Sequence, residues 1–188
     1  MRRVFNYIPR LRRRTALKWM HWGIIPFFVW FLFADPDALR RMGPAVFQFH
    51  SVMGLIFVTL ALLWTAGYLR RGLAGKPGPK LPLWARRMHR LLHHTLILGL
   101  FLVAVGGFLL GLTSSVVLWA GGVLPIAPAL GLSQANTIVG KLHTYQFYGL
   151  AAVVLFHALF HLWRHIRLRD NALRIMAPNV LHLSLIHI

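Results

Sequence analysis

Two histidines on one long uncharged segment, His143 and His157, are the residues best suited to chemistry in this sequence. They are 14 residues apart, and at 100° per residue this spacing is about 40° short of four full helical turns. On a helix both imidazoles therefore point to one face, about 21 Å apart along the axis. Because a neutral imidazole binds heme iron through one ring nitrogen, the spacing predicts two binding levels on one helix.

Each level needs a second imidazole from another helix, because an electron-transfer heme commonly takes two histidine ligands. His50 lies near the start of an expected helix that begins outside the cell, at the depth of His143. His21 lies near the start of one that begins inside, at the depth of His157. We therefore predict the pairs His50/His143 and His21/His157. Gly54, one turn after His50, has no side chain and leaves room for a ring edge.

Four apolar segments position these histidines. Each has about the 20 residues that a bilayer-spanning helix needs, or more. A cluster of glycines and prolines between residues 121 and 128 breaks the longest uncharged run and predicts an interfacial loop. The fold class expected is all-α, a transmembrane four-helix bundle. We expect its helices over residues 16–34, 46–69, 88–113 and 142–166.

The composition agrees with a membrane protein and excludes several other classes. Of the 188 residues 57% are hydrophobic and 13% are charged, with 21 Lys and Arg against 3 Asp and Glu. A soluble domain is about 25% charged. The basic residues stand in blocks between apolar runs, which argues against nucleic acid as a partner, and three acids leave little for acid–base hydrolysis. The absence of Cys excludes cysteine-ligated clusters and covalent heme within this chain.

The distribution of the basic residues predicts the orientation in the membrane. With both termini cytoplasmic, eighteen Lys and Arg lie inside and three outside, as the positive-inside rule requires. Membrane lipid is then the first partner. We expect a basic arm over 1–15, a membrane domain over 16–178 and a tail of unknown role over 179–188. A cleavable signal peptide over 1–34 is the rival interpretation, and His21 argues against it.

The remaining histidines of the spans are expected to have other roles. His89, His93 and His94 begin the third helix beside several arginines, which is typical of an interface. His93 shares a helix face with small residues and so is also placed to contact a heme edge or a quinone. His161 lies one turn beyond His157 and is the alternative ligand at that level.

Several segments together resemble the bacterial cytochrome b561 family of four-helix, di-heme b membrane proteins. The His spacing on the fourth helix, combined with an Asp-x-x-Leu-Arg-x-Met-x-Pro segment after it, is the most specific part. The resemblance covers about residues 12–178. The matching pieces are Trp19–Trp22, His50–Gly54, His143, His157 and Asp170–Pro178.

The resemblance implies a quinone-linked electron-transfer oxidoreductase of the bacterial inner membrane. It implies two non-covalent b hemes with His21, His50, His143 and His157 as axial ligands, and ubiquinone as the substrate. It also implies superoxide oxidation on the outer side, although only three basic residues lie there. The physiological electron donor and acceptor stay open. Two alternatives remain: a membrane-anchor cytochrome b subunit of a dehydrogenase or hydrogenase, and a heme-free transporter or channel with pore-lining His.

Overall fold

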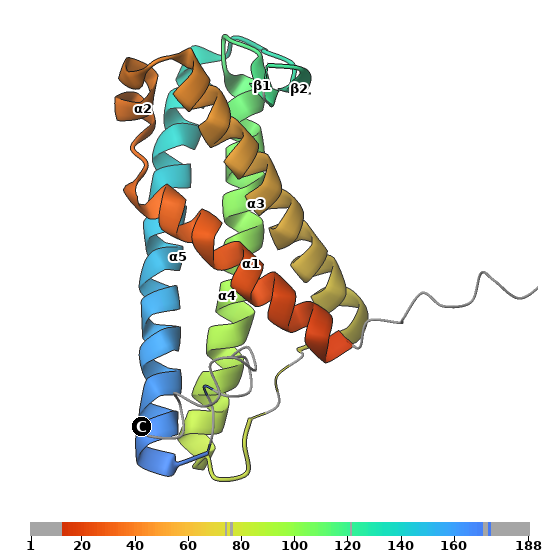
Figure 1. Ribbon diagram of the computed structural model, residues 1–188, viewed down its shortest axis with the longest axis vertical. Coiled ribbons are helices and arrows are strands. Elements are labelled where there is room, and N and C mark those ends of the chain that lie inside the picture. Colours follow the sequence, from red (N-terminus) through yellow and green to blue (C-terminus); the bar gives the residue numbers. More distant parts are fainter. Residues whose placement is uncertain (1–12, 74, 76, 121, 171–172, 174–188) are drawn as a thin grey trace, which may run out of the picture.

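Four long helices make up most of the computed structural model, which describes residues 13–73, 75, 77–120, 122–170 and 173 (Figure 1). The predicted arm over 1–15 falls largely outside the described residues, and Arg13–Thr15 already belong to the first helix. The predicted tail over 179–188 lies wholly outside them. The elements are α1 (Arg13–Phe33), α2 (Pro36–Met42), α3 (Pro44–Arg71), α4 (Leu83–Thr113), β1 (Leu118–Ala120), β2 (Leu124–Ala127) and α5 (Ser133–Leu168).

The helices α1, α3, α4 and α5 are long and apolar enough to cross a membrane, which confirms the predicted all-α class and four spans. Large apolar side chains also point outward, among them Leu63, Leu98 and Leu155. Lipid tails are as apolar as these side chains, so a spanning helix needs no polar face. The most extensive packing is between α4 and α5; α3 packs next against α4, and α1 packs against α3.

The helix α5 begins at Ser133, nine residues before the predicted start at residue 142. Its 36 residues extend over about 54 Å, more than the hydrocarbon thickness of about 30 Å. The extra turns are polar, and the Asn136 amide donates hydrogen bonds to the Leu110 carbonyl (2.9 Å) and to the Thr113 hydroxyl (3.0 Å). These bonds attach the first turns of α5 to the last turn of α4. A prediction from apolar runs misses such turns.

The predicted interfacial loop between α4 and α5 contains an antiparallel hairpin of β1 and β2, with Trp119 opposite Pro125. Gly122 turns the chain between the strands with a φ of 76°, which a residue without a Cβ adopts at little cost. A Cβ at Gly122 would lie 3.4 Å from Oε1 of Gln48. The hairpin therefore covers the start of α3, two residues from His50, and we call this end of the bundle the hairpin end (Figure 1).

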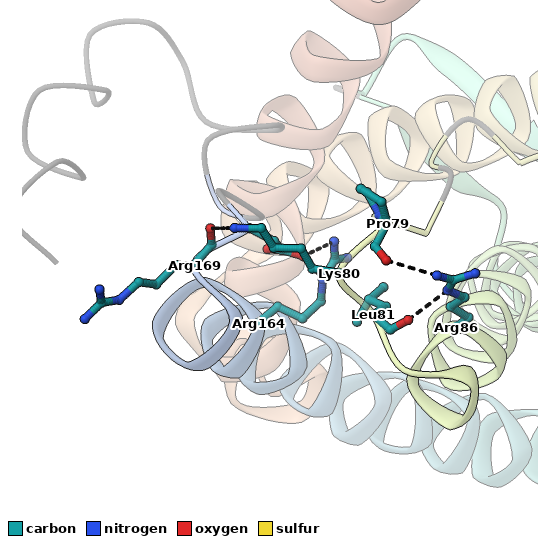
Figure 2. A network of polar contacts seen from close by, with 7 residues as sticks. Pro79, Lys80, Leu81, Arg86, Arg164 and Arg169 are labelled. Atoms are coloured by element: carbon teal, nitrogen blue, oxygen red, sulfur yellow. Dashed lines mark hydrogen bonds and ion pairs between the residues drawn. The ribbon is translucent and has the colours of Figure 1, made fainter.

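The opposite end, which we call the loop end, carries the connection between α3 and α4, of which residues 77–82 are described without a gap. Arg86 donates hydrogen bonds from Nε to the Leu81 carbonyl (2.8 Å) and from Nη2 to the Pro79 carbonyl (3.0 Å) (Figure 2). Lys80 donates to the Arg169 carbonyl (3.0 Å), just after α5. The loop is thereby fastened both to its own helix and to the end of the last helix.

A buried ion pair holds the same region from the side of α5. Arg164 donates to one carboxylate oxygen of Asp170 from Nε (2.9 Å) and from Nη2 (2.7 Å). The two side chains are 2% and 4% exposed. A Cβ at Gly78 would lie 3.1 Å from Nη2 of Arg164, so the loop lies directly against the pair. Asp170 opens the segment that carried the most specific part of the resemblance.

The middle of the bundle is apolar. Ile24, Phe57, Val103 and Leu150 form one buried cluster, and each comes from a different spanning helix. Phe147 and Val154 of α5 pack against this cluster. Along α5 the cluster lies between His143 and His157, so an apolar layer separates the two histidine levels.

Candidate functional site

The spanning helices carry nine histidines in the described part of the chain, and these gather toward the two ends of the bundle. One is on α1 and one on α3, three are on α4 and four are on α5. They are His21, His50, His89, His93, His94, His143, His157, His161 and His165.

His50 of α3 and His143 of α5 both lie toward the hairpin end and interact electrostatically. The His50 ring stands at 85° to the ring of Phe31, with centroids 4.9 Å apart. Phe31 also lies next to Gly54, where a Cβ would come within 3.8 Å of its Cζ. The structure therefore places Gly54 in the same aromatic surroundings as His50.

The His143 side chain lies directly against the backbone of α4. A Cβ at Gly106 would lie 2.9 Å from Nδ1 of His143 and 2.6 Å from Oε1 of Gln146, and one at Gly107 would lie 3.3 Å from Cε1 of His143. At contacts below 3.0 Å the neighbouring atoms must shift, so a side chain at position 106 would displace the His143 ring. Two adjacent glycines thus clear the space that the His143 ring occupies.

His21 of α1 and His157 of α5 both lie toward the loop end and interact electrostatically. Trp22 and Trp64 flank His21, each with its ring centroid 6.2 Å away. The rings closest to His157 are those of His93, at 4.9 Å, and His161, at 4.5 Å between ring centroids. The pairing of His21 with His157 and of His50 with His143 stays a prediction.

The residues of these pairs fit a heme by their chemistry and by their surroundings. Buried polar atoms in proteins nearly always have a hydrogen-bond partner. Nδ1 of His21, His143 and His157 is buried and has none among the described residues. Burial of a ring nitrogen without a partner costs free energy. Histidines that bear this cost indicate a site for a group that the polypeptide does not itself supply. Buried neutral imidazoles are the donors that b-type heme iron takes.

The histidines at the start of α4 lie differently from the expectation that all three face the interface. His94 is exposed and stands against the Tyr68 ring, in line with that expectation. His89 is buried, at 2% exposure, and His93 is half-buried beside His157 and His161. The sequence held a sign of this arrangement: His–x–x–x–His spacings occur on both neighbouring helices, once on α4 and twice in succession on α5.

Half-buried histidines on apolar spanning helices are typical of a membrane protein that binds a metal-containing group inside its bundle. The chain belongs to the prokaryotic cytochrome b561 family, whose model matches residues 12–179. No curated protein and no solved structure matches the chain significantly. Family membership confirms the resemblance seen in the sequence. The chain is a multi-pass membrane protein, and its family implies transmembrane electron transfer by b-type heme.

Proposed function

We propose that the protein binds two non-covalent b hemes, one between His50 and His143 and the other between His21 and His157. The observation that supports this most is that the two histidines of each pair interact electrostatically across separate helices, on either side of one apolar layer. The two levels are about 21 Å apart along α5 by the helix rise. Electrons would then cross most of the membrane between them.

The heme supplies one-electron redox chemistry when bound, and this chain supplies its position and its surroundings. Each imidazole pair holds one level in place, with Gly106 and Gly107 admitting the His143 ring at the hairpin end. The apolar layer of Ile24, Phe57, Val103 and Leu150 keeps water out of the space between the levels. Exclusion of water lowers the local dielectric and prevents side reactions.

The orientation that we propose puts the loop end and both termini in the cytoplasm, with the bacterial inner membrane as the location. Basic side chains crowd the loop end, where Arg70, Arg71, Arg86, Arg87 and Arg90 are all exposed. At the hairpin end the exposed basic side chains of the described part are Arg41 and Lys141. Cytoplasmic ends of membrane proteins carry this excess of Lys and Arg.

Exchange with the quinone pool, with ubiquinone as the substrate, completes the proposal. One quinone takes up two electrons and two protons to become a quinol, so each turnover needs two passages through the bundle. On the outer side, two superoxide anions giving up one electron each would release two O₂ and supply both electrons. The sparse basic charge of the hairpin end gives this donor weaker support than the quinone.

Heme stoichiometry in the purified full chain tests the proposal. We expect two hemes per chain by pyridine hemochrome assay, a b-type α band in the reduced-minus-oxidised spectrum, and heme reduction by a short-chain ubiquinol. One heme per chain contradicts the paired arrangement, and a folded but colourless protein favours the transporter alternative. Stoichiometric co-purification of a dehydrogenase or hydrogenase subunit would instead indicate the membrane-anchor alternative.

A further inference from the structure

Three histidines outside the proposed heme pairs form a compact cluster at the loop end. His89 and His93 come from α4 and His161 comes from α5. One ring nitrogen from each of the three lies within 4.8 Å of the others. His89 and His93 are four residues apart and so project from the same face of α4, with ring centroids 4.1 Å apart.

The ring nitrogens of this cluster have free lone pairs. Nδ1 of His93 is 2.6 Å from the His89 carbonyl, and because a carbonyl only accepts, this nitrogen donates and Nε2 keeps the lone pair. A histidine fixed in its tautomer by such a bond is the usual form of a metal ligand. Nδ1 of His89 and Nε2 of His161 are buried with no hydrogen-bond partner among the described residues. Without a bound group, the burial of these nitrogens costs free energy that no hydrogen bond offsets.

Gly75 of the connection between α3 and α4 lies directly against the cluster. A Cβ at Gly75 would lie 3.7 Å from Cε1 of His89 and 3.9 Å from Nε2 of both His89 and His93. Gly75 is itself exposed. An exposed residue without a side chain is therefore the neighbour of two of the three imidazoles.

We propose that His89, His93 and His161 bind one divalent transition-metal ion, and that Zn²⁺ suits this donor set. Three imidazoles with one open position are an established zinc arrangement, with Zn–N distances of about 2.0–2.1 Å. Tetrahedral coordination at these distances places the ligand nitrogens about 3.3 Å from one another. The three nitrogens already lie within 4.8 Å of one another, so small rotations of the rings would bring them to an ion.

The charges around the cluster permit a cation. Arg164 carries a permanent positive charge that interacts electrostatically with all three histidines of the cluster. Its guanidinium is neutralised by Asp170 at 2.7 Å, so the ion would meet a neutral pair rather than a bare positive charge. The site uses none of the four proposed heme ligands. It lies beside one of them, since the His161 and His157 rings are 4.5 Å apart.

Zinc binding to the detergent-purified full chain tests this proposal without reference to electron transfer. The protein carries no polyhistidine tag, and His182 and His187 are changed to Ala in every sample to remove other imidazoles. After chelator treatment, titration with Zn²⁺ against a chromophoric chelator is expected to give one tight site per chain. X-ray absorption of this sample is expected to show three imidazole nitrogens at about 2.0–2.1 Å.

Single substitutions assign the site to its residues. His89→Ala, His93→Ala and His161→Ala are each expected to weaken Zn²⁺ binding at least about tenfold, as loss of a ligand requires. His94→Ala, on the same stretch of α4 but exposed, is expected to leave it unchanged. The heme spectrum of each variant reports whether it has folded. A wild type without a stoichiometric site, or equal binding in all four variants, overturns the proposal. An X-ray absorption spectrum without imidazole scattering also overturns the proposal, and this measurement requires no substitution in the cluster.

Discussion

Gly106 and His143 are in direct contact across the interface of α4 and α5. A Cβ at Gly106 would lie 2.9 Å from Nδ1 of His143, closer than such atoms approach. The position of the His143 ring is therefore set by the backbone of the neighbouring helix rather than by a side chain that can move aside.

Gly106→Ala is expected to remove the heme of the hairpin end and to leave the heme of the loop end in place. The added methyl group displaces the His143 ring and the Gln146 amide, which would lie 2.6 Å from it. Heme content should fall from two per chain to one. Gly149→Ala on α5 is the matched control, because a Cβ there meets nothing within 4 Å. If both variants keep two hemes, the contact does not position a ligand.

Substitution of the paired histidines is expected to remove hemes by pair rather than by helix. His50→Ala and His143→Ala should lose the same heme, and His21→Ala and His157→Ala the other. In each variant the affected level keeps a single imidazole, whereas the proposed heme iron there takes two histidine ligands. Redox titration of each variant, with two distinguishable components in the wild type, identifies the heme that is lost.

The control for the paired substitutions is His165→Ala. This histidine of α5 is buried but belongs to neither pair, so both hemes should stay. Two members of one proposed pair that lose different hemes would show that the assignment by depth is wrong.

Breaking the ion pair of Arg164 and Asp170 is expected to destabilise the loop end strongly. The side chains are 2% and 4% exposed, and a buried charge left without its partner costs about 3–5 kcal/mol. Arg164→Met and Asp170→Asn should each lower the free energy of unfolding by this amount in a denaturant titration. The double variant Arg164→Met/Asp170→Asn should lose less stability than the sum of the two single losses. Additive losses would contradict a direct coupling.

Leu150→Ala is expected to destabilise the bundle by about 2–5 kcal/mol, the usual range for a core leucine, without removing either heme. Leu150 is 4% exposed at the centre of the apolar layer. Its Cδ1 would lie 3.0 Å from a Cβ at Gly99, which shows how closely α4 and α5 approach there. Leu155→Ala, on the same helix but 62% exposed, should change stability by well under half as much.

The sequence predicted the four spanning helices well because uncharged apolar length is itself the physical requirement for crossing a membrane. The end of α4 at Thr113 agrees with the prediction. The start of α5 does not, because the polar turns from Ser133 are held by Asn136 bonds to α4 that no apolar pattern reveals. The β1–β2 hairpin was missed for a similar reason: its glycines and prolines indicate only that a helix stops.

The histidines show the same division between what spacing reveals and what packing decides. The separation of His143 and His157 by 14 residues was enough to predict two levels on one helix face, since helical periodicity is fixed. The inward placement of His89 depends instead on how the start of α4 packs against Phe160 and His161 of α5. That contact joins residues more than seventy positions apart, which no local pattern reveals.

The bonds that hold the connection between α3 and α4 have a consequence for biogenesis. Arg86 holds Pro79 and Leu81 from the first turn of α4, whereas Lys80 reaches the Arg169 carbonyl just after α5. Because ribosomes translate from the N-terminus, the bond to Arg169 can form only after α5 has been synthesised. His161 also belongs to α5, so the proposed metal site is completed at the same late step, and an ion would bind it only once the last helix is in place.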